Sequence, residues 1–247
     1  MLPLSGAEIL LALPLVRSFG LVFPILTSIF ITSSSLVATY VSVKAFLREG
    51  VLAVLLLGCG ALVFGISCIV ASALWGTEGL EFSGAVFALG ALVSGVFHLG
   101  CASSSYRGRK QLDRPAGIAV ATLSAAVLLI ALSLATALTR ATPPFFEQGF
   151  GTTLLGQVTL GLAGGAFAAA FVLISAVSRS NNSRVLYWYS LSLAATVAGI
   201  FGVVVSGGDI LSIAMRLGWG ALFVGGLFLL ASLLSAESAA DINSMNR

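Results

Sequence analysis

Two ionisable side chains lie inside long apolar stretches of this sequence, and they are the first candidates for chemistry. Arg216 lies about six residues into the last stretch, and His98, the only histidine, lies deep in the third. Ionisable groups are unfavourable in a bilayer, so they commonly mark functional sites there. The long side chain of Arg216 is able to extend outward to water, but we predict that it turns inward to an acidic or amide partner, with Asp209 and Gln157 among the candidates. His98 either bonds to a neighbouring helix or contacts a ligand.

Most intramembrane chemistry needs residues that the apolar stretches lack. No second histidine and no carboxylate stands at the depth of His98, so we predict no metal site. The only lysines, Lys44 and Lys110, lie at the end of the first stretch and between the third and fourth, which excludes a retinal pigment with a lysine in its seventh helix. A relay through buried carboxylates is excluded in the same way. The cysteines Cys59, Cys68 and Cys101 show no metal-ligand spacing. We therefore expect no enzyme activity and no cofactor.

These residues must be positioned by seven apolar stretches that fill the chain almost end to end. The composition is 58% hydrophobic and 9% charged, with a mean hydropathy of +1.09. A membrane-spanning helix needs about 20 apolar residues, and inside lipid each backbone polar group must be satisfied within its own helix. We predict an all-α integral membrane bundle of seven helices, near 21–44, 51–75, 82–105, 116–139, 152–178, 185–206 and 210–235.

The chain divides into three parts around this bundle. Residues 1–20 are apolar but contain Pro3 and Pro14, and no basic segment precedes them. That pattern argues against a cleaved signal peptide and favours either a short interfacial helix or a loosely ordered tail. Residues 21–236 form the seven-transmembrane helical domain, and 237–247 form a short cytoplasmic tail.

The distribution of charge predicts the orientation in the membrane. The net charge is +3, yet nine of the twelve basic residues fall on one side of the predicted bundle. Positive residues accumulate in short cytoplasmic loops, so the N-terminus is predicted outside and the C-terminus in the cytoplasm of a multi-pass plasma-membrane protein. The basic excess is thus a topology signal and does not indicate a nucleic-acid partner. The nine residues are Lys44, Arg48, Arg107, Arg109, Lys110, Arg114, Arg179, Arg184 and Arg247.

The connection between the fourth and fifth stretches, ATPPFFEQGFGTT, is rich in aromatic residues and turn formers. Its two prolines end the fourth helix, because the residue before a proline disfavours helical backbone. Thr152 or Thr153 is suited to cap the fifth helix. The three phenylalanines, Phe145, Phe146 and Phe150, either join an interfacial aromatic belt or form a lid over a pocket.

Small and hydroxyl side chains are frequent in the first, second, third and fifth stretches. The first alone carries Thr27, Ser28, Thr32, Ser33, Ser34, Ser35 and Thr39. Such residues permit close helix packing and bond to backbone carbonyls. The alternative is that the hydroxyls line a polar cavity.

The order of five segments resembles a known family, the seven-transmembrane sensory modules of the MASE type that precede PAS, histidine-kinase or diguanylate-cyclase domains in archaea and bacteria. The segments are KAFLREGVLAVLLLGCGALVFG (44–65), FALGALVSGVFHLG (87–100), PPFFEQGFGTTLLGQVTLGLA (143–163), YWYSLSLAATVAGIFGV (187–203) and RLGWGALFVGG (216–226). Positions that match the family's motifs are Pro143, Pro144, Phe145, Phe146, Gly149, Gly151, Arg216 and His98. Gly156 stands where the family often has an arginine, and the asparagine usual near the start of the third helix is missing.

The resemblance implies a membrane-embedded sensory or ligand-binding module. No PAS, kinase or coiled-coil segment follows the last helix in this sequence. Either the chain is part of a longer sensor, or it is free-standing and acts through another membrane protein chain or a homo-oligomer, and we expect the second. The expected ligand-binding residues are Phe145, Phe146, Gln157, Arg216 and Trp219. The alternative is an accessory or structural subunit of a larger membrane complex that packs through its small-residue faces, and a small-solute transporter is a third reading.

Overall fold

The computed structural model is a helical bundle with one short hairpin, which confirms the all-α part of the predicted fold class. It describes the backbone of residues 6–77, 79–108, 115–139, 143–147, 151–206 and 212–245, and the side chains of these ranges except at 6–21, 23, 76, 77, 80, 147 and 237–245. The helices are α1 (Gly6–Glu49), α2 (Leu52–Thr77), α3 (Leu80–Tyr106), α4 (Pro115–Leu138), α5 (Leu154–Asn181), α6 (Arg184–Val205) and α7 (Ile213–Met245). Strands β1 (Phe146–Glu147) and β2 (Gly151–Thr152) pair antiparallel between α4 and α5.

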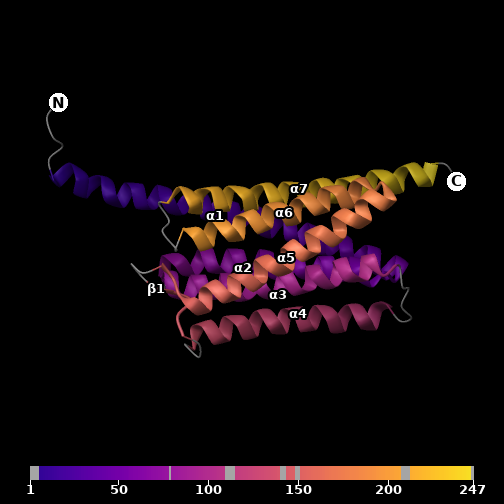
Figure 1. The fold of residues 1–247 in the computed structure, drawn as a ribbon, viewed down its shortest axis with the longest axis horizontal. Helices are drawn as coiled ribbons and strands as arrows, with labels where there is room; N and C mark the ends of the chain where they lie inside the picture. Colours follow the sequence, from indigo (N-terminus) through magenta and orange to yellow (C-terminus); the bar gives the residue numbers. More distant parts are fainter. Residues whose placement is uncertain are drawn as a thin grey trace.

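All seven helices are long and apolar enough to cross a membrane, as expected of a multi-pass membrane protein. Two of them extend further than the sequence predicted. The first helix begins at Gly6 and continues without a break through residue 21. Figure 1 shows this N-terminal part of α1 reaching beyond the neighbouring helices. At the other end of the chain, α7 continues to Met245 through most of the predicted tail.

Six of the helices close into a ring, and α4 lies outside it. Around the ring, α1 packs on α2, α2 on α3, α3 on α5, α5 on α6, α6 on α7 and α7 on α1. The fourth helix instead packs on the outer side of α2 and α3, with a smaller contact to α1. Its buried residues are three alanines, Ala119, Ala126 and Ala137. The ring therefore passes directly from α3 to α5 and leaves out α4.

Hydroxyl groups and glycines bring α1, α2 and α3 close together. The hydroxyl of Thr32 donates to the carbonyl of Gly65 at 2.7 Å, and that of Thr39 donates to Gly58 at 2.9 Å. A Cβ added to Gly65 would lie 2.6 Å from the Cβ of Ser35. Small residues let membrane helices approach in this way. The close-packing interpretation of the hydroxyl-rich first span is therefore confirmed at these positions.

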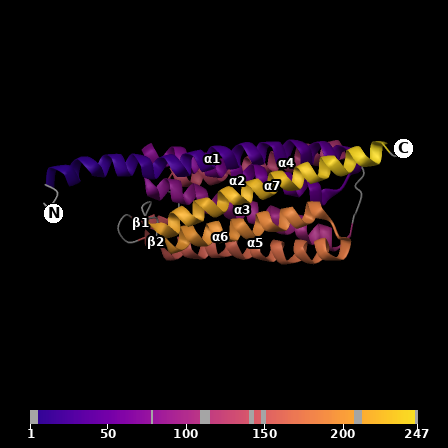
Figure 2. The same ribbon diagram turned by 90° about the horizontal axis from the view of Figure 1, so that it is seen from above.

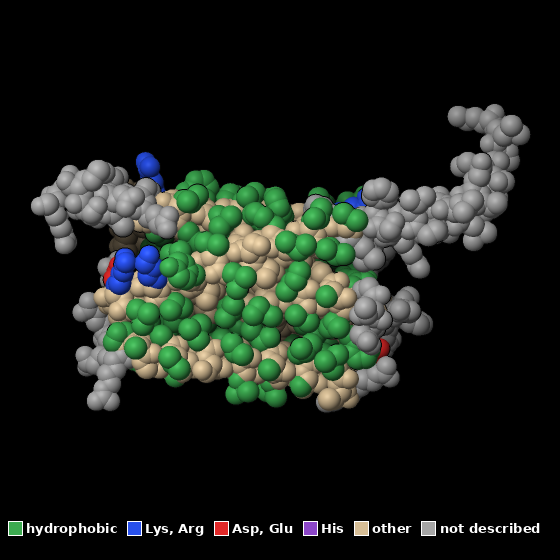
Figure 3. Space-filling model, turned by 180° about the vertical axis from the view of Figure 1, so that it is seen from behind, with side chains coloured by type: hydrophobic (Ala, Val, Ile, Leu, Met, Phe, Trp, Pro, Cys, Tyr) green, Lys and Arg blue, Asp and Glu red, His purple; other side chains and the backbone are tan. Residues whose placement is uncertain are grey.

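The outer surface is apolar between its two ends. Large hydrophobic side chains such as Leu128, Phe201 and Leu217 are more than 60% exposed. Figure 3 shows one face on which hydrophobic and uncharged side chains cover the middle, whereas the visible Lys and Arg side chains lie toward the ends. Such a surface is suited to contact with lipid, because a soluble protein rarely exposes apolar patches of that extent.

The hairpin is fixed to the first turn of α5. Thr153 caps this helix, as one of the two predicted caps, and accepts a hydrogen bond from the backbone N–H of Gly156 at 3.2 Å. The same hydroxyl donates to the carbonyl of Pro144 at 2.7 Å. A Cβ on Gly156 would collide with the carbonyl oxygen of Phe145. The hairpin and the start of α5 therefore form one tightly packed unit.

Candidate functional site

The hairpin places Phe145 and Phe146 in the interior at one end of the ring. Both side chains are 2% exposed. Phe146 packs directly on Gly84 of α3, where any added Cβ would collide with the phenyl ring. This burial fits the lid interpretation of the aromatic loop better than the interfacial belt. Phe150, the third aromatic residue of the loop, lies outside the described residues.

Beneath Phe146 lies a small cavity, called here the hairpin-end cavity. Its volume of about 20 Å³ is enough for one water molecule. The walls are apolar and aromatic and come from α2, α3, α6, α7 and the hairpin. They are Ala71, Ser72, Trp75, Ser83, Gly84, Phe87, Phe146, Val203, Met215 and Trp219. The structure thus brings two of the predicted ligand-binding residues, Phe146 and Trp219, to one cavity.

Trp219 carries the most unusual polar group of this cavity. The residue is 3% exposed, and its ring contacts that of Phe87 with centroids 6.1 Å apart. Within the described part of the chain, its indole Nε1 is the buried side-chain nitrogen or oxygen that has no hydrogen-bond partner. An unsatisfied buried donor costs about 1–3 kcal/mol. A bound acceptor at this nitrogen would remove that penalty.

Two other predicted ligand-binding residues lie outside the cavity. Gln157 is exposed, and its amide donates to the carbonyl of Thr152 at 3.2 Å. Arg216 is also exposed, so the expectation that it points into the bundle is wrong. It is one position from Leu217, which is 68% exposed, on the outward face of α7. Near the end of a membrane-spanning helix, a long cationic side chain can extend until its charged group reaches water. That costs less free energy than burying the charge inside the bundle. The expected partner Asp209 lies outside the described residues.

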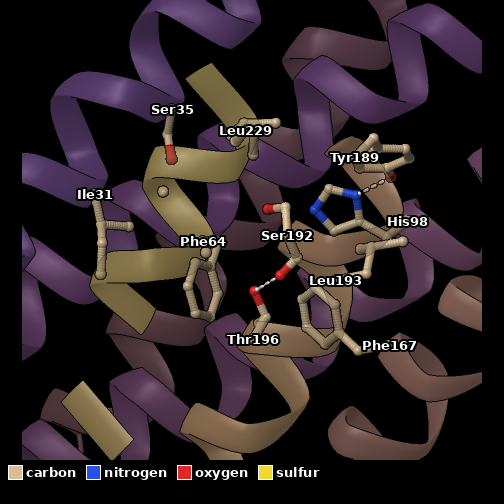
Figure 4. Close-up of a pocket in the computed structure, with 13 residues that line it drawn as sticks. Ile31, Ser35, Phe64, His98, Phe167, Tyr189, Ser192, Leu193, Thr196 and Leu229 are labelled. Carbon is tan, nitrogen blue, oxygen red and sulfur yellow. Dashed lines mark hydrogen bonds between the residues drawn. The ribbon is translucent and has the colours of Figure 1, made fainter. Parts of the chain in front are cut away.

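A second cavity, called here the central cavity, lies on the axis of the ring. Its volume is about 30 Å³, enough for two water molecules. All six ring helices contribute to its wall, as Figure 4 shows for the labelled side chains. The lining residues are Ile31, Ser35, Ala61, Phe64, His98, Phe167, Tyr189, Ser192, Leu193, Thr196, Gly225, Gly226 and Leu229. The hydroxyl-lined alternative from the sequence is therefore present in part, because Ser35 of α1 lines this cavity; the hydroxyls of Ser192 and Thr196 come from α6, which that alternative did not include.

His98 is the ionisable group of the central cavity. It is 5% exposed, and its Nδ1 lies 2.7 Å from the hydroxyl of Tyr189 on α6. Phe167 of α5 stacks beside the imidazole with ring centroids 5.2 Å apart. The second nitrogen, Nε2, faces α2, where a Cβ on Gly60 would lie 2.9 Å away. Of the two readings of His98, the helix-to-helix hydrogen bond is confirmed.

Tyr189 was not among the candidate residues, and sequence reasoning had little means to find it. It is fully enclosed at 1% exposure and stands 91 positions from His98. The motif YWYS carries tyrosines at 187 and 189, and Tyr187 is 53% exposed. Only the rotation of α6 in the ring decides which tyrosine faces inward. A buried Tyr needs a hydrogen-bond partner, and that rule alone suggests a link to the single histidine.

The three cysteines lie in the interior of the bundle. All three are free and buried. Over the residues that the structure describes, no group of three or more His, Cys, Asp or Glu side chains is arranged to hold a metal ion. Cys101 differs from the other two cysteines because its thiol lies beside the side chains of Tyr189 and Ser105.

The chain matches no protein-family model, no curated protein and no solved structure. The resemblance to sensory modules therefore stays a prediction, and the two cavities are the features from which a function has to be argued.

Proposed function

We propose that this chain is a membrane-embedded sensory or ligand-binding module, and that its ligand binds in the hairpin-end cavity between Phe146 and Trp219. The observation that carries the proposal is the buried indole N–H of Trp219, which has no partner among the described residues. Buried polar groups are normally hydrogen bonded. Trp219 also lines this cavity, so a ligand bound there could supply the missing hydrogen-bond acceptor.

The lining of the cavity defines the chemical class of ligand. Trp75, Phe87 and Phe146 provide aromatic surface, and the hydroxyl of Ser83 is already bonded to the carbonyl of Ala71 at 2.7 Å. The expected ligand is therefore apolar, with a single acceptor such as a carbonyl or ether oxygen. Any ligand larger than water has to displace the ring of Phe146 from Gly84, because the closed cavity measures about 20 Å³.

Displacement of Phe146 offers a way to transmit binding. The hairpin is bonded to the first turn of α5 through Thr153, and α5 carries Phe167 in the central cavity. A ligand shifts a conformational equilibrium only when it binds one state better than the other. Here the two states differ in the position of Phe146. A change at the hairpin would reach the six-helix ring through α5, and a partner chain would detect it.

The experiment is native mass spectrometry of the full chain after gentle extraction, with Trp219→Phe compared against Trp188→Phe. The first variant removes the N–H from the cavity and keeps an aromatic ring, whereas Trp188 stands outside both cavities. We expect a small apolar molecule to copurify with the wild-type chain and with Trp188→Phe, and to be lost from Trp219→Phe. Equal retention in all three proteins, or a ligand-free wild-type monomer, would contradict the proposal.

The alternative, an accessory or structural subunit, is favoured by α4. This helix lies outside the ring, and Leu128 and Leu132 on it are 67% and 58% exposed. A subunit interface built on α4 would appear in the same experiment as a stable hetero-complex without a small ligand. Photo-crosslinkers placed at Leu128 and Leu132 would then capture the neighbouring chain.

A further inference from the structure

The face of α3 toward the central cavity carries a stripe of side chains that can both donate and accept a proton. His98, Cys101 and Ser105 follow one another at spacings of three and four residues, which places them on one side of a helix. One turn before them, Ser94 is already bonded to the carbonyl of Gly60 at 2.8 Å. The stripe thus continues from His98 toward the end of α3 at Tyr106.

Tyr189 completes a path along this stripe. Its hydroxyl lies 2.7 Å from Nδ1 of His98 and also beside the thiol of Cys101. The thiol in turn lies beside Ser105. Cys101 is 3% exposed, whereas Ser105 is half-buried and is followed by Tyr106, which is 65% exposed. The path therefore runs from the water-facing end of α3 to the middle of the ring.

We propose that His98 is a proton-binding site, reached from the Tyr106 end of α3 along Ser105, Cys101 and Tyr189. This inference does not rest on the proposed ligand at Trp219. The ligand at His98 is a proton, and the central cavity holds the water that solvates the protonated ring. The sequence analysis excluded a proton relay through buried carboxylates. Hydroxyl, thiol and imidazole groups can also relay protons, because each carries a proton and an acceptor lone pair.

The proton transfer conserves atoms and charge and needs no further reactant. A hydronium ion at the entrance gives one proton to Ser105 and becomes water. Ser105, Cys101 and Tyr189 each accept one proton and pass on the proton that they carried, so all three end neutral. The last proton goes to Nδ1 of His98 in the tautomer that carries hydrogen on Nε2. His98 ends as an imidazolium ion, with its Nε2–H directed away from Tyr189.

The surroundings of His98 explain why its protonation would affect the packing of the six-helix ring. From α1, α2, α5 and α7, the lining residues are apolar, hydroxyl-bearing or glycine. Among the described residues that face His98, the titratable ones are Tyr189 of α6 and Cys101 of α3. No carboxylate among them balances the imidazolium. Its charge is then solvated by water in a cavity that holds about two molecules, and more water enters only if the ring loosens.

Figure 4 shows the surroundings of the imidazole that would carry this charge. The imidazole lies between the hydroxyl of Tyr189 on one side and the cavity on the other, with the side chain of Ser192 directed into the same space. Gly60 keeps the wall open next to Nε2, since any side chain there would approach that nitrogen within 3 Å. Acid is therefore expected to favour a more hydrated and looser ring.

The single histidine makes the test direct. With isotope-labelled histidine in the full chain in lipid nanodiscs, NMR gives one imidazole signal, that of His98. We expect this signal to shift from the neutral to the imidazolium form as the pH is lowered. The signal should also report rapid proton exchange with water at neutral pH. A signal that stays neutral down to the pH at which the protein unfolds would overturn the proposal.

Variants of Cys101 test the path itself. Cys101→Ala removes the middle group, whereas Cys101→Ser keeps a donor and an acceptor at the same place. We expect Cys101→Ala to slow proton exchange at His98 by about tenfold, the effect of losing one hydrogen-bonding group at the barrier, and Cys101→Ser to restore it. Equal exchange rates in the two variants would refute the path, and gel filtration and circular dichroism confirm that both remain folded. Trp188→Phe, at a residue outside both cavities, should leave exchange at His98 unchanged.

Discussion

His98 of α3 and Tyr189 of α6 share a hydrogen bond of 2.7 Å although α5 stands between their helices in the ring. The bond therefore passes on the inner side of α5 instead of joining adjacent helices. It fixes the orientation of the imidazole and satisfies the hydroxyl of a tyrosine that is 1% exposed. Two helices that are not ring neighbours are thus coupled through their side chains.

This hydrogen bond should be measurable as a coupling energy. In a double-mutant cycle with His98→Ala and Tyr189→Phe, we expect an interaction of about 0.6 kcal/mol, the average for side-chain hydrogen bonds between membrane helices, and of no more than about 1.7 kcal/mol. The measurement is reversible unfolding in mixed micelles. Tyr187→Phe is the matched control, because Tyr187 is 53% exposed on the same helix and should show no coupling to His98. Strict additivity of His98→Ala and Tyr189→Phe would contradict the prediction.

Gly60 should tolerate no side chain. Its added Cβ would lie 2.9 Å from Nε2 of His98, within a wall of the central cavity. We expect Gly60→Ala to destabilise the chain by about 1–3 kcal/mol, as overpacking of a well-packed interior does. Gly161→Ala on α5 is the control, because nothing lies within 4 Å of its added Cβ. That change should be neutral or slightly stabilising, since alanine favours helix. Similar thermal unfolding of the two variants would count against this packing.

Gly84 should control the position of Phe146. An added methyl group would occupy the space of the phenyl ring, so Gly84→Ala is expected to push Phe146 out of the hairpin-end cavity. In a background with Trp75→Phe and Trp188→Phe, the fluorescence of Trp219 should then shift to longer wavelength as water reaches the indole. Gly220→Ala, next to Trp219 but with open space around its added Cβ, should leave the spectrum unchanged. An identical spectrum for Gly84→Ala would show that Phe146 does not cover Trp219.

The orientation in the membrane is testable at Ser104, close to the end of α3. With nine of the twelve basic residues on this side, the segment 103–114 is expected in the cytoplasm. A cysteine introduced by Ser104→Cys should react with a membrane-impermeant reagent only after the cells are opened. The three native cysteines are buried, so the unsubstituted chain provides the background. Robust labelling of intact cells would reverse the topology.

Arg216 should contribute little to stability. Its side chain is exposed, and surface substitutions away from special features usually change stability by less than about 0.5 kcal/mol. Arg216→Gln is expected to unfold at the same denaturant concentration as the wild-type chain. Arg184→Gln, at another exposed arginine near a helix end, is a suitable comparison. If Arg216→Gln lowered the free energy of unfolding by about 2 kcal/mol or more and Arg184→Gln did not, Arg216 would have a buried partner. That result would contradict the prediction.

The sequence identified some residues of the candidate site and missed others. The aromatic loop, Trp219 and His98 stood out because aromatic and ionisable side chains are scarce among small apolar ones. Arg216 stood out for the same reason, yet its position on the outward face of α7 removes it from both cavities. The sequence places a residue along a helix and at a depth, but the rotation of that helix decides whether the residue faces lipid or the interior.

The sequence by itself determined the seven helices, because a bilayer offers no other partner for the backbone N–H and C=O groups of a long apolar stretch. It also determined most of the helix ends, at charged residues, prolines and capping threonine or serine side chains, but not the start of α1 or the end of α7. Only the tertiary structure decided that α4 stands outside the ring and that Tyr189 meets His98. Apolar helices resemble one another in sequence, so their order depends on which small-residue faces fit together, and that fit exists only when all six ring helices are in place.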